Sequence, residues 1–416
     1  MTRVILASEY KKMPGWFRFL NRAWKVTYPL GTRIKLDKDD LIKSARKNTG
    51  LHDMGQDFWD EPLDRLIKAV NEEAKLHPIG LFITKKRLIN LLTTRLLAEW
   101  WFKKEPGILE QELYPVLLIA GLQRTGTTKL QRLLSADPDA RSLLSWEALC
   151  PAPPVKGPDR RIKFARRSEK ALKYMAPGFF AIHPVEHKSQ EEDILLLDVS
   201  FLSTTPEATM HVPSYATWLE KTDQSQAYAY AVKLLKLLQW QRPAKHWILK
   251  SPHHLEFFDL IDKHFRNVHY LWTHRDLSYC IPSFLSMVAH ARGIFSDQVD
   301  IDRLSRHWMN KTKYMLEKAM LFRKKNPKKD QFTDISYDLF IDHPLETIRL
   351  VYNRAGMIMD PKLEDILRTL EQKNRKSKYG SHHYRLSDFS LAKNIIRDHY
   401  SEYLKFVEEI NIINPT

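Results

Sequence analysis

"YPVLLIAGLQRTGTTKLQRLL", Tyr114 to Leu134, is the part of this sequence from which the architecture follows. The apolar run at its start predicts a parallel strand that is buried on both faces. The middle, "GLQRTGTT", predicts a tight loop. Leu130, Leu133 and Leu134 then predict one apolar face of a helix, which Pro138 ends. A strand that runs through a glycine-containing loop into a helix is typical of a phosphate-binding loop in an α/β protein.

The loop departs from the nucleoside-triphosphatase template G-x-x-x-x-G-K-[S/T] at one position. Its glycines match Gly121 and Gly126. Thr128 matches the final hydroxyl, but Thr127 stands where the template has lysine. Backbone N–H groups at a helix N-terminus still bind an anion, and Arg124 supplies a positive charge from within the loop. A sulfuryl group carries one fewer negative charge than a terminal phosphate, so arginine and hydroxyl donors can stabilise its transfer without a metal.

The composition limits the class of protein. The chain has 416 residues, of which 43% are hydrophobic and 28% charged, as expected for a globular protein with a substantial core. No apolar run is long enough to cross a bilayer and the first residues lack a secretory cleavage site, so we expect a cytoplasmic protein. Cys150 and Cys280 are far apart and lack C-x-x-C spacing, which indicates neither a disulfide framework nor a zinc site. The net charge of +16 attracts polyanions, whether nucleic acid, an anionic membrane or a phosphorylated cofactor.

The chain divides into two parts with different patterns. Residues 1–110 show amphipathic helical periodicity and no convincing strand, which predicts a helical N-terminal extension. From residue 111 to residue 416, strands alternate with helices. Further strands are predicted at His246–Lys250, Val268–Arg275 and Gln331–Tyr337. This alternation predicts a P-loop-like α/β domain of three layers, in which helices flank a central parallel sheet and ligands bind at the carboxyl ends of its strands.

Three stretches resemble motifs of the sulfotransferases that use 3′-phosphoadenosine 5′-phosphosulfate (PAPS). "LLIAGLQRTGTTKLQRLLSADPDARSLLSWE" resembles the family's 5′-phosphosulfate loop, in the branch that has Arg where cytosolic enzymes usually have Lys. "WILKSPHHLEFF" (Trp247–Phe258) and "HYLWTHRDLSYCIPSF" (His269–Phe284) are similar to two further motifs. The resemblance extends over about residues 115–295 and continues more weakly at His382–Leu391. It implies an enzyme that moves a sulfuryl group from PAPS to a hydroxyl acceptor, a small molecule or a lipid.

The resemblance also implies a role for each motif residue. Arg124 would neutralise the oxygen that bridges sulfur and the 5′-phosphate, and Lys250 would contact the sulfuryl oxygens. Arg275 and Ser283, eight residues later, would bind the 3′-phosphate, although Pro282 could shift the start of that helix. The residues that would cradle the 5′-phosphosulfate are Thr125, Gly126, Thr127 and Thr128. For the loop residues the alternative is an ordinary turn with a threonine cap. For the basic residues at strand ends the alternative is a solvated side chain.

The acceptor hydroxyl must lose a proton to a general base. Glu147, in "LLSWEALCPAP", follows the loop's helix, and a Glu in this region is the base in tyrosylprotein and heparan-type relatives. Its alternative role is that of a helix-start or ion-pairing residue. His253 and His254 are rival bases, because cytosolic sulfotransferases use a His and imidazole titrates near neutrality. Both histidines could equally be structural.

A basic segment near the end of the chain, "NRKSKYGSHHY" (Asn374–Tyr384), has the position and charge of the lid that covers the 3′-phosphate in many relatives. Arg375, Lys376 and Lys378 are the candidates, and an exposed basic loop is the alternative. The histidine pairs of the chain lack the spacing of metal ligands, so we expect no metal.

Two other functions stay open. A P-loop kinase or NTPase would use "ILLLD" (Ile194–Asp198) as a metal-binding strand, although the same residues fit a helix equally well. A nucleic-acid or anionic-membrane binding protein would use the basic runs, such as Asp159–Arg167. The sulfotransferase interpretation predicts no nucleic-acid partner and leaves peripheral membrane contact open. Aromatic residues of the N-terminal part either line an acceptor pocket or form core: Phe58, Trp59, Trp100, Trp101 and Phe102.

Overall fold

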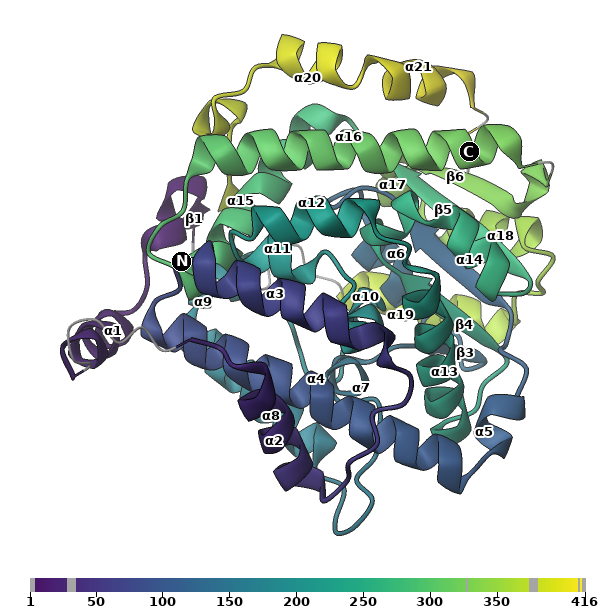
Figure 1. Ribbon diagram of the computed structural model, residues 1–416. Coiled ribbons are helices and arrows are strands. Elements are labelled where there is room, and N and C mark those ends of the chain that lie inside the picture. Colours follow the sequence, from purple (N-terminus) through teal and green to yellow (C-terminus); the bar gives the residue numbers. More distant parts are fainter. Residues whose placement is uncertain (1–3, 28–34, 327, 374–380, 411, 414–416) are drawn as a thin grey trace.

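A five-stranded parallel sheet lies at the centre of the molecule (Figure 1). The computed structural model describes the chain except for residues 1–3, 28–34, 327, 374–380, 411 and 414–416. The strand order is β3-β4-β2-β5-β6. The strands are β2 (Val116–Ala120), β3 (Ala140–Ser142), β4 (His246–Lys250), β5 (Val268–His274) and β6 (Phe332–Ser336). The parallel α/β fold is confirmed, and each predicted strand is present within one residue at either end. The short edge strand β3 was not predicted.

Strand β2 shows why the central run of sequence is apolar throughout. Its side chains alternate between two core clusters, with Leu117 and Ile119 in one and Val116, Leu118 and Ala120 in the other. All five are at most 2% exposed. Helices cover both faces of the sheet, so neither side of this strand can be polar.

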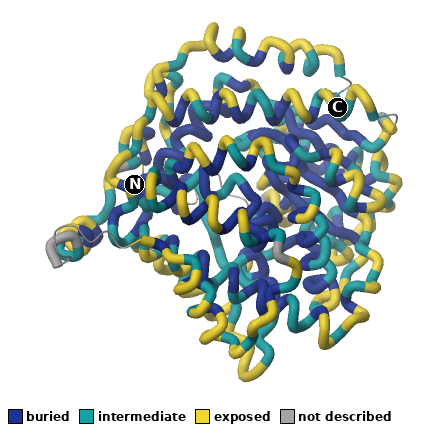
Figure 2. The backbone as a smooth tube through the Cα atoms, in the orientation of Figure 1, coloured by how far each residue is buried: buried dark blue, intermediate teal, exposed yellow. Residues whose placement is uncertain are grey.

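The helices form the two outer layers of the fold. One face of the sheet packs against α6 (Thr127–Leu134), α17 (Tyr337–Asp342), α18 (Pro344–Arg354) and α19 (Pro361–Lys373). The other face packs against a larger set that includes α13 (Ser225–Gln241), α14 (Phe258–His264), α15 (Leu277–Phe295), α16 (Ile301–Lys325), α20 (Lys393–His399) and α21 (Ser401–Glu409). Figure 2 shows buried residues concentrated in the sheet and the helix turns next to it, with exposed residues on the outer turns.

The N-terminal part is mainly helical, as predicted, and packs onto the second of these layers. Its helices are α1 (Gly15–Thr27), α2 (Lys38–Thr49), α3 (Asp60–Glu72), α4 (Pro78–Lys104) and α5 (Gly107–Glu110). Side chains of α2, α3 and α4 belong to the same core cluster as Val116 and Leu118. Among the described helices, none is long and apolar enough to cross a membrane.

The expectation that residues 1–110 contain no strand was wrong. β1 (Val4–Leu6) pairs in parallel with β7 (Ser381–His383), and Val4 lies opposite Ser381 in the register. A three-residue strand has too short a pattern to be recognised locally, and here it is held by a partner from the other end of the chain.

Shorter helices connect the layers. They are α7 (Ser145–Leu149), α8 (Arg161–Met175), α9 (Pro177–Ile182), α10 (Ile194–Leu197), α11 (Thr205–Thr209) and α12 (Pro213–Lys221). Short 3₁₀ turns are η1 (Ala7–Lys11), η2 (Asp57–Trp59), η3 (Asp198–Ser200), η4 (Pro252–Glu256), η5 (Lys329–Gln331) and η6 (Leu386–Phe389).

Candidate active site

The predicted motifs meet at the carboxyl edge of the sheet. β2 lies between β4 and β5, and all three strands are parallel. The loop that follows β2 is therefore flanked by Lys250, the last residue of β4, and by Arg275, which follows the end of β5. In open parallel sheets this edge is where ligands bind.

The loop has the geometry of an anion site. Gly121 has a φ of +143°, and a Cβ at this position would lie only 2.2 Å from Oγ1 of Thr273. Gly126 caps helix α6 with a φ of +89°. The first backbone hydrogen bond of that helix runs from Leu130 N–H to the Gly126 carbonyl at 3.1 Å, so earlier N–H groups point out of the helix end. The first turn of α6 has no acidic residue, and the helix dipole there favours an anion.

The threonines of the loop differ in their surroundings. Thr125 is buried, and its Oγ1 lies 2.6 Å from both the Leu122 carbonyl and Oγ1 of Thr273. That hydroxyl ties the loop to β5. Thr127 is buried in the first turn of α6, whereas Thr128 is exposed at the same helix end. The backbone and hydroxyl of Thr128 are thus the most accessible hydrogen-bond donors among the threonines.

The structure brings Arg124, Arg275 and Ser283 together. Arg124 has a φ of +74°, its Nε donates to Ser283 Oγ at 3.0 Å, and its carbonyl accepts from Arg275 Nη1 at 2.9 Å. The Arg275 guanidinium also stacks 3.9 Å from the centre of the Tyr337 ring. Helix α15 begins at Leu277 and continues through its internal proline, so that proline does not move Ser283 away from the loop.

These two guanidinium groups lack a negative partner within the part of the chain that the structure describes. No carboxylate of the described residues lies within ion-pair distance of Arg124 or Arg275. Burial lowers the pKa of the Arg124 guanidinium, Tyr384 opposes that shift, and the Arg275 charge adds to it. An anion bound between the two arginines would offset both costs.

Lys250 is nearly buried, with 3% of its side chain exposed, and its Nζ lies 2.6 Å from Oε1 of Glu192. The charges of Glu192, Lys250 and Arg124 all act on His183. Burial, the largest cause, lowers the pKa of His183 to about 4. The three charged groups therefore lie close enough to this histidine to affect its pKa.

Glu192 is a functional candidate that the sequence did not reveal. It lies in the acidic run "QEED" before α10, and nothing in that run distinguishes one carboxylate from the next. Its side chain is 25% exposed, whereas that of Glu147 is 2% exposed. Gln131 of α6 holds this segment, since its Nε2 donates to the Glu191 carbonyl at 3.1 Å.

The predicted base Glu147 is buried in a cluster of ion pairs. Its carboxylate accepts from Arg141 Nη2 at 2.9 Å, from Arg242 Nη2 at 3.1 Å and from the Leu144 N–H at 3.0 Å, and the residue is 1% exposed. Arg242 precedes β4, and its Nη2 also donates to the Ser142 carbonyl at 3.2 Å, so the ion pair joins the end of β3 to the segment before β4. These contacts fit the alternative role of Glu147, which is that of a helix-start and ion-pairing residue.

The two histidines after β4 are held inside the protein. Each is 2% exposed. Nε2 of His254 lies 2.5 Å from Asp193 Oδ2 and Nδ1 lies 3.0 Å from the Tyr228 hydroxyl, so both ring nitrogens are occupied. Burial keeps the pKa of His253 well below its usual value. Their surroundings match the structural alternative.

The candidate lid residues Arg375, Lys376 and Lys378 lie outside the described residues. The strand that follows them, β7, returns to the site: His382 Nε2 lies 2.8 Å from Ser286 Oγ on α15. Ser286 is one helical turn beyond Ser283.

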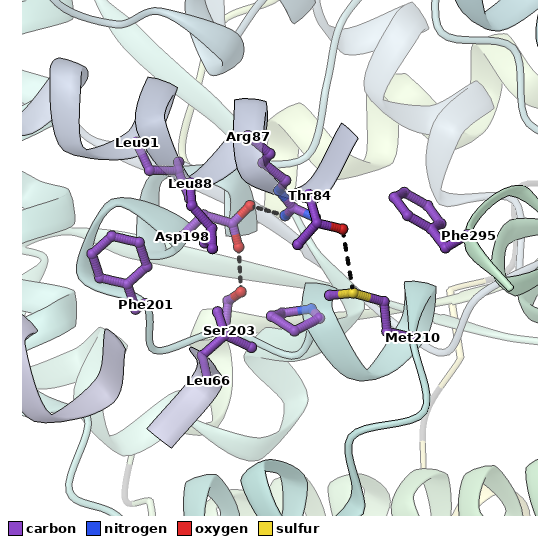
Figure 3. A pocket seen from close by; sticks show the side chains of 11 residues that line it. Leu66, Thr84, Arg87, Leu88, Leu91, Asp198, Phe201, Ser203, Met210 and Phe295 are labelled. Atoms are coloured by element: carbon purple, nitrogen blue, oxygen red, sulfur yellow. Dashed lines mark hydrogen bonds and ion pairs between the residues drawn. The ribbon is translucent and has the colours of Figure 1, made fainter. Parts of the chain in front are cut away.

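The "ILLLD" segment is helical, which removes the metal-binding strand that a P-loop NTPase would need. Its last residue, Asp198, faces an internal cavity between α3, α4 and α11 (Figure 3), where it bonds to Arg87 and to Ser203. The cavity has a volume of about 20 Å³, close to the size of one water molecule, so it does not hold an acceptor. Among the described residues, no cluster of three or more His, Cys, Asp or Glu is arranged to hold a metal ion.

Four of the five aromatic residues named as candidates for an acceptor pocket belong to the core or pack against it. Trp59 and Phe102 are buried, and Phe58 and Trp101 pack against the same cluster. Arg95 lies 4.7 Å from the Phe58 ring and is itself fully buried. These contacts therefore favour a role in the core over the lining of an acceptor pocket.

Comparison with known proteins agrees with this arrangement. A family model described as "Sulfotransferase family" matches residues 115–361. The solved structure of sulfotransferase STF1 from Mycobacterium tuberculosis H37Rv superimposes with a TM-score of 0.77 and is 28% identical; the match covers 88% of this chain and 99% of that one. Sulfotransferase STF9 from Mycobacterium avium has a TM-score of 0.81, 23% identity and coverage of 93% and 100%, which shows a shared fold. No curated protein sequence matches significantly.

The matched segment of the family model includes the loop after β2, the ends of β4 and β5, and both Arg124 and Arg275. It extends over more than half of the chain. The protein therefore belongs to the sulfotransferase family.

Proposed function

We propose that this enzyme transfers the sulfuryl group of PAPS to a hydroxyl acceptor by in-line, metal-independent transfer. The observation that carries the proposal is the pair Arg124 and Arg275, which lie beside the N-terminus of α6 without a carboxylate partner among the described residues. A nucleotide with a 5′-phosphosulfate and a 3′-phosphate supplies two anions, one for each guanidinium.

In this proposal the two anionic groups occupy different parts of the site. The 5′-phosphosulfate lies at the helix end formed by Gly126, Thr127 and Thr128, with Arg124 on the oxygen that leaves sulfur. The 3′-phosphate lies on Arg275 and Ser283. The Thr125 hydroxyl is engaged with β5, so we assign it to holding the loop.

We infer that Glu192, in place of Glu147, is the carboxylate that takes the acceptor's proton. It is the carboxylate bonded to Lys250, and it is partly open, whereas Glu147 is saturated by two arginines and a backbone N–H. Lys250 then has two tasks: it holds Glu192 in place and presents its positive charge to the sulfuryl oxygens. A base must lie within hydrogen-bond reach of the proton that it removes, and a buried, fully bonded carboxylate cannot meet this requirement.

The cofactor assignment predicts binding without a metal. Adenosine 3′,5′-bisphosphate is expected to raise the melting temperature, because a ligand that binds only the native state stabilises it. The shift should persist in EDTA, since arginine and lysine supply the charge that Mg²⁺ supplies in an NTPase. Differential scanning fluorimetry measures it, with ATP as control. A shift that requires Mg²⁺, or one that is larger with ATP, would contradict the proposal.

Replacing Arg275 by alanine tests the 3′-phosphate site. The affinity for adenosine 3′,5′-bisphosphate is expected to fall by about 1.5–3 kcal/mol, the size of a lost charged hydrogen bond, while the fold persists. Isothermal titration calorimetry measures the loss. Arg266→Ala is the matched control, because Arg266 is 84% exposed and pairs only at the surface with Glu112. Unchanged affinity in Arg275→Ala would place the 3′-phosphate elsewhere.

A further inference from the structure

Exposed aromatic side chains gather on three helices that lie away from the active site loop. Within the described part of the chain, the exposed Phe, Tyr and Trp residues are Phe19, Phe82, Phe164, Tyr174, Trp240 and Tyr279. The first four lie on α1, the start of α4, and α8. Exposed Leu20 and Ile162 lie on α1 and α8 as well. Apolar side chains gathered on one surface indicate an interaction site, whereas scattered ones do not.

Helix α1 is anchored by one face and presents the other to solvent. Phe17 packs edge-on against His77 with ring centres 5.4 Å apart, and Asn21 Oδ1 accepts from the Ile79 N–H at 3.1 Å. The outward side carries Phe19, which is 70% exposed, and Leu20, which is 47% exposed. Arg18 and Arg22 are exposed on the flank of the helix next to the anchored face, where they line a cavity with Phe17 and Asn21. The helix projects from the body of the protein beside the start of α4 (Figure 1). Its apolar outer side chains are thus held outward by contacts on its inner side.

Helix α8 contributes positive charge next to α1. Its exposed basic side chains are Lys163, Arg166, Arg167, Lys170 and Lys173. The only acidic residue of this helix is Glu169, and its carboxylate pairs with Lys173 and His187, each at 2.5 Å. The outer surface of α8 is therefore strongly basic, with Ile162 and Phe164 at its margins.

Two ring contacts join these helices into one surface, which we call the α1/α8 face. Trp16 of α1 stacks on Tyr174 of α8, with ring centres 4.9 Å apart and planes at 22°. Trp24 of α1 lies 6.3 Å from Phe82 of α4, whose ring also has Lys86 Nζ at 5.6 Å. These contacts join the C-terminal end of α8 to α1, and α1 to the first turns of α4.

We propose that the α1/α8 face binds the surface of a lipid bilayer that contains anionic lipids. Phe19 and Leu20 enter the boundary between headgroups and acyl chains, and the lysines and arginines of α8 contact the anionic headgroups. A helix with aromatic and leucine side chains on one side, next to many basic residues, is the pattern of interfacial binding. The proposal does not depend on the sulfuryl-transfer assignment, because bilayer binding is measured without turnover.

Charge favours a bilayer over the other occupants of such a surface. Two copies of the α1/α8 face would bring their basic side chains together, and like charges repel. A nucleic acid would contact the basic surface of α8 but would leave Phe19 and Leu20 in water. An anionic bilayer is the partner that satisfies both the charge and the exposed apolar side chains.

Sedimentation of the full chain with lipid vesicles tests the proposal. We expect binding to vesicles of phosphatidylcholine with about a third phosphatidylglycerol, and much weaker binding to phosphatidylcholine alone. Binding should weaken as salt rises, because the Debye length falls from about 10 Å at 0.1 M to about 3 Å at 1 M. Equal binding to both vesicles, or to neither, would overturn the proposal.

Variants separate the apolar and charged contributions. Two double variants are each expected to lower partition into anionic vesicles about tenfold or more. The first is Phe19→Ser with Leu20→Ser, and the second is Arg166→Glu with Arg167→Glu. The matched controls are Ile358→Ser with Ile395→Ser, at positions 95% and 43% exposed, and Arg397→Glu with Lys405→Glu, at side chains 74% and 67% exposed. The controls should bind as wild type does, and melting temperatures should be unchanged throughout.

Two results would assign the face differently. If Phe19→Ser with Leu20→Ser binds vesicles as wild type does, the face is not the bilayer contact. If sedimentation velocity shows a dimer of the wild type that this double variant abolishes, and vesicles are not bound, the face joins two copies of the chain and the bilayer proposal is wrong.

Discussion

Glu192→Gln is expected to lower turnover by about 10²–10⁴-fold and to leave the affinity for adenosine 3′,5′-bisphosphate nearly unchanged, because the amide keeps the shape of the side chain but cannot accept a proton. The prediction rests on the 2.6 Å contact between Glu192 and Lys250 at the carboxyl edge of the sheet. The amide oxygen can still accept a hydrogen bond from Lys250, so the lysine should stay in place. Single-turnover kinetics with one accepted alcohol measures the chemical step directly.

Glu147→Gln is the matched control for this experiment. Glu147 is bonded to two arginines and is buried, so its amide variant should lose thermal stability and keep turnover near that of wild type. The opposite pattern, with an inactive Glu147→Gln enzyme and an active Glu192→Gln enzyme, would restore Glu147 as the base. His253→Ala and His254→Ala, at buried positions, should likewise affect stability more than the pH dependence of turnover.

Arg124→Ala is expected to reduce turnover by about 10²–10³-fold, the loss seen when one preorganised donor to a developing negative charge is removed. The charge on the oxygen between sulfur and the 5′-phosphate grows as the bond breaks, so the loss should be larger in turnover than in nucleotide affinity. Because Arg124 adopts a φ of +74°, an alanine there experiences similar backbone strain, and the comparison isolates the guanidinium.

Arg124→Lys provides the companion measurement. It keeps a positive charge but loses the planar group that donates to Ser283, so we expect turnover between those of Arg124→Ala and wild type. Initial rates and calorimetric affinities for all three proteins separate the two effects. If Arg124→Ala weakens nucleotide binding and leaves the single-turnover rate unchanged, Arg124 acts in binding alone.

Prediction from the sequence succeeded where the signal is local. Side chains of β2 alternate between two buried layers within five residues, and the glycines of the loop and the leucines of α6 follow directly. The positions of Lys250 and Arg275 are local in the same way, because Lys250 ends one strand with a strong apolar pattern and Arg275 follows another. Parallel strands bring such ends to one edge, so the order of the motifs is enough to predict that they meet.

The sequence alone was insufficient where a structural feature depends on a distant partner. β1 exists because β7 pairs with it across nearly the whole chain. Glu147 is turned into an ion pair by Arg242, which lies 95 residues further on, and Glu192 becomes a candidate base because Lys250, 58 residues further on, lies against it.

The amino-acid pattern of the chain thus determined the parallel α/β fold, the phosphate-type loop and the positively charged strand ends, because periodicity and glycine placement act over a few residues. Packing between segments decided which carboxylate lies against Lys250, which histidines are buried and which aromatic side chains are exposed. Glu147 and Glu192 are both glutamates near helix starts, but their partners differ. The buried guanidinium of Arg141 lies against Glu147, and the ammonium of Lys250 lies against Glu192. These partners give the two carboxylates different chemical surroundings.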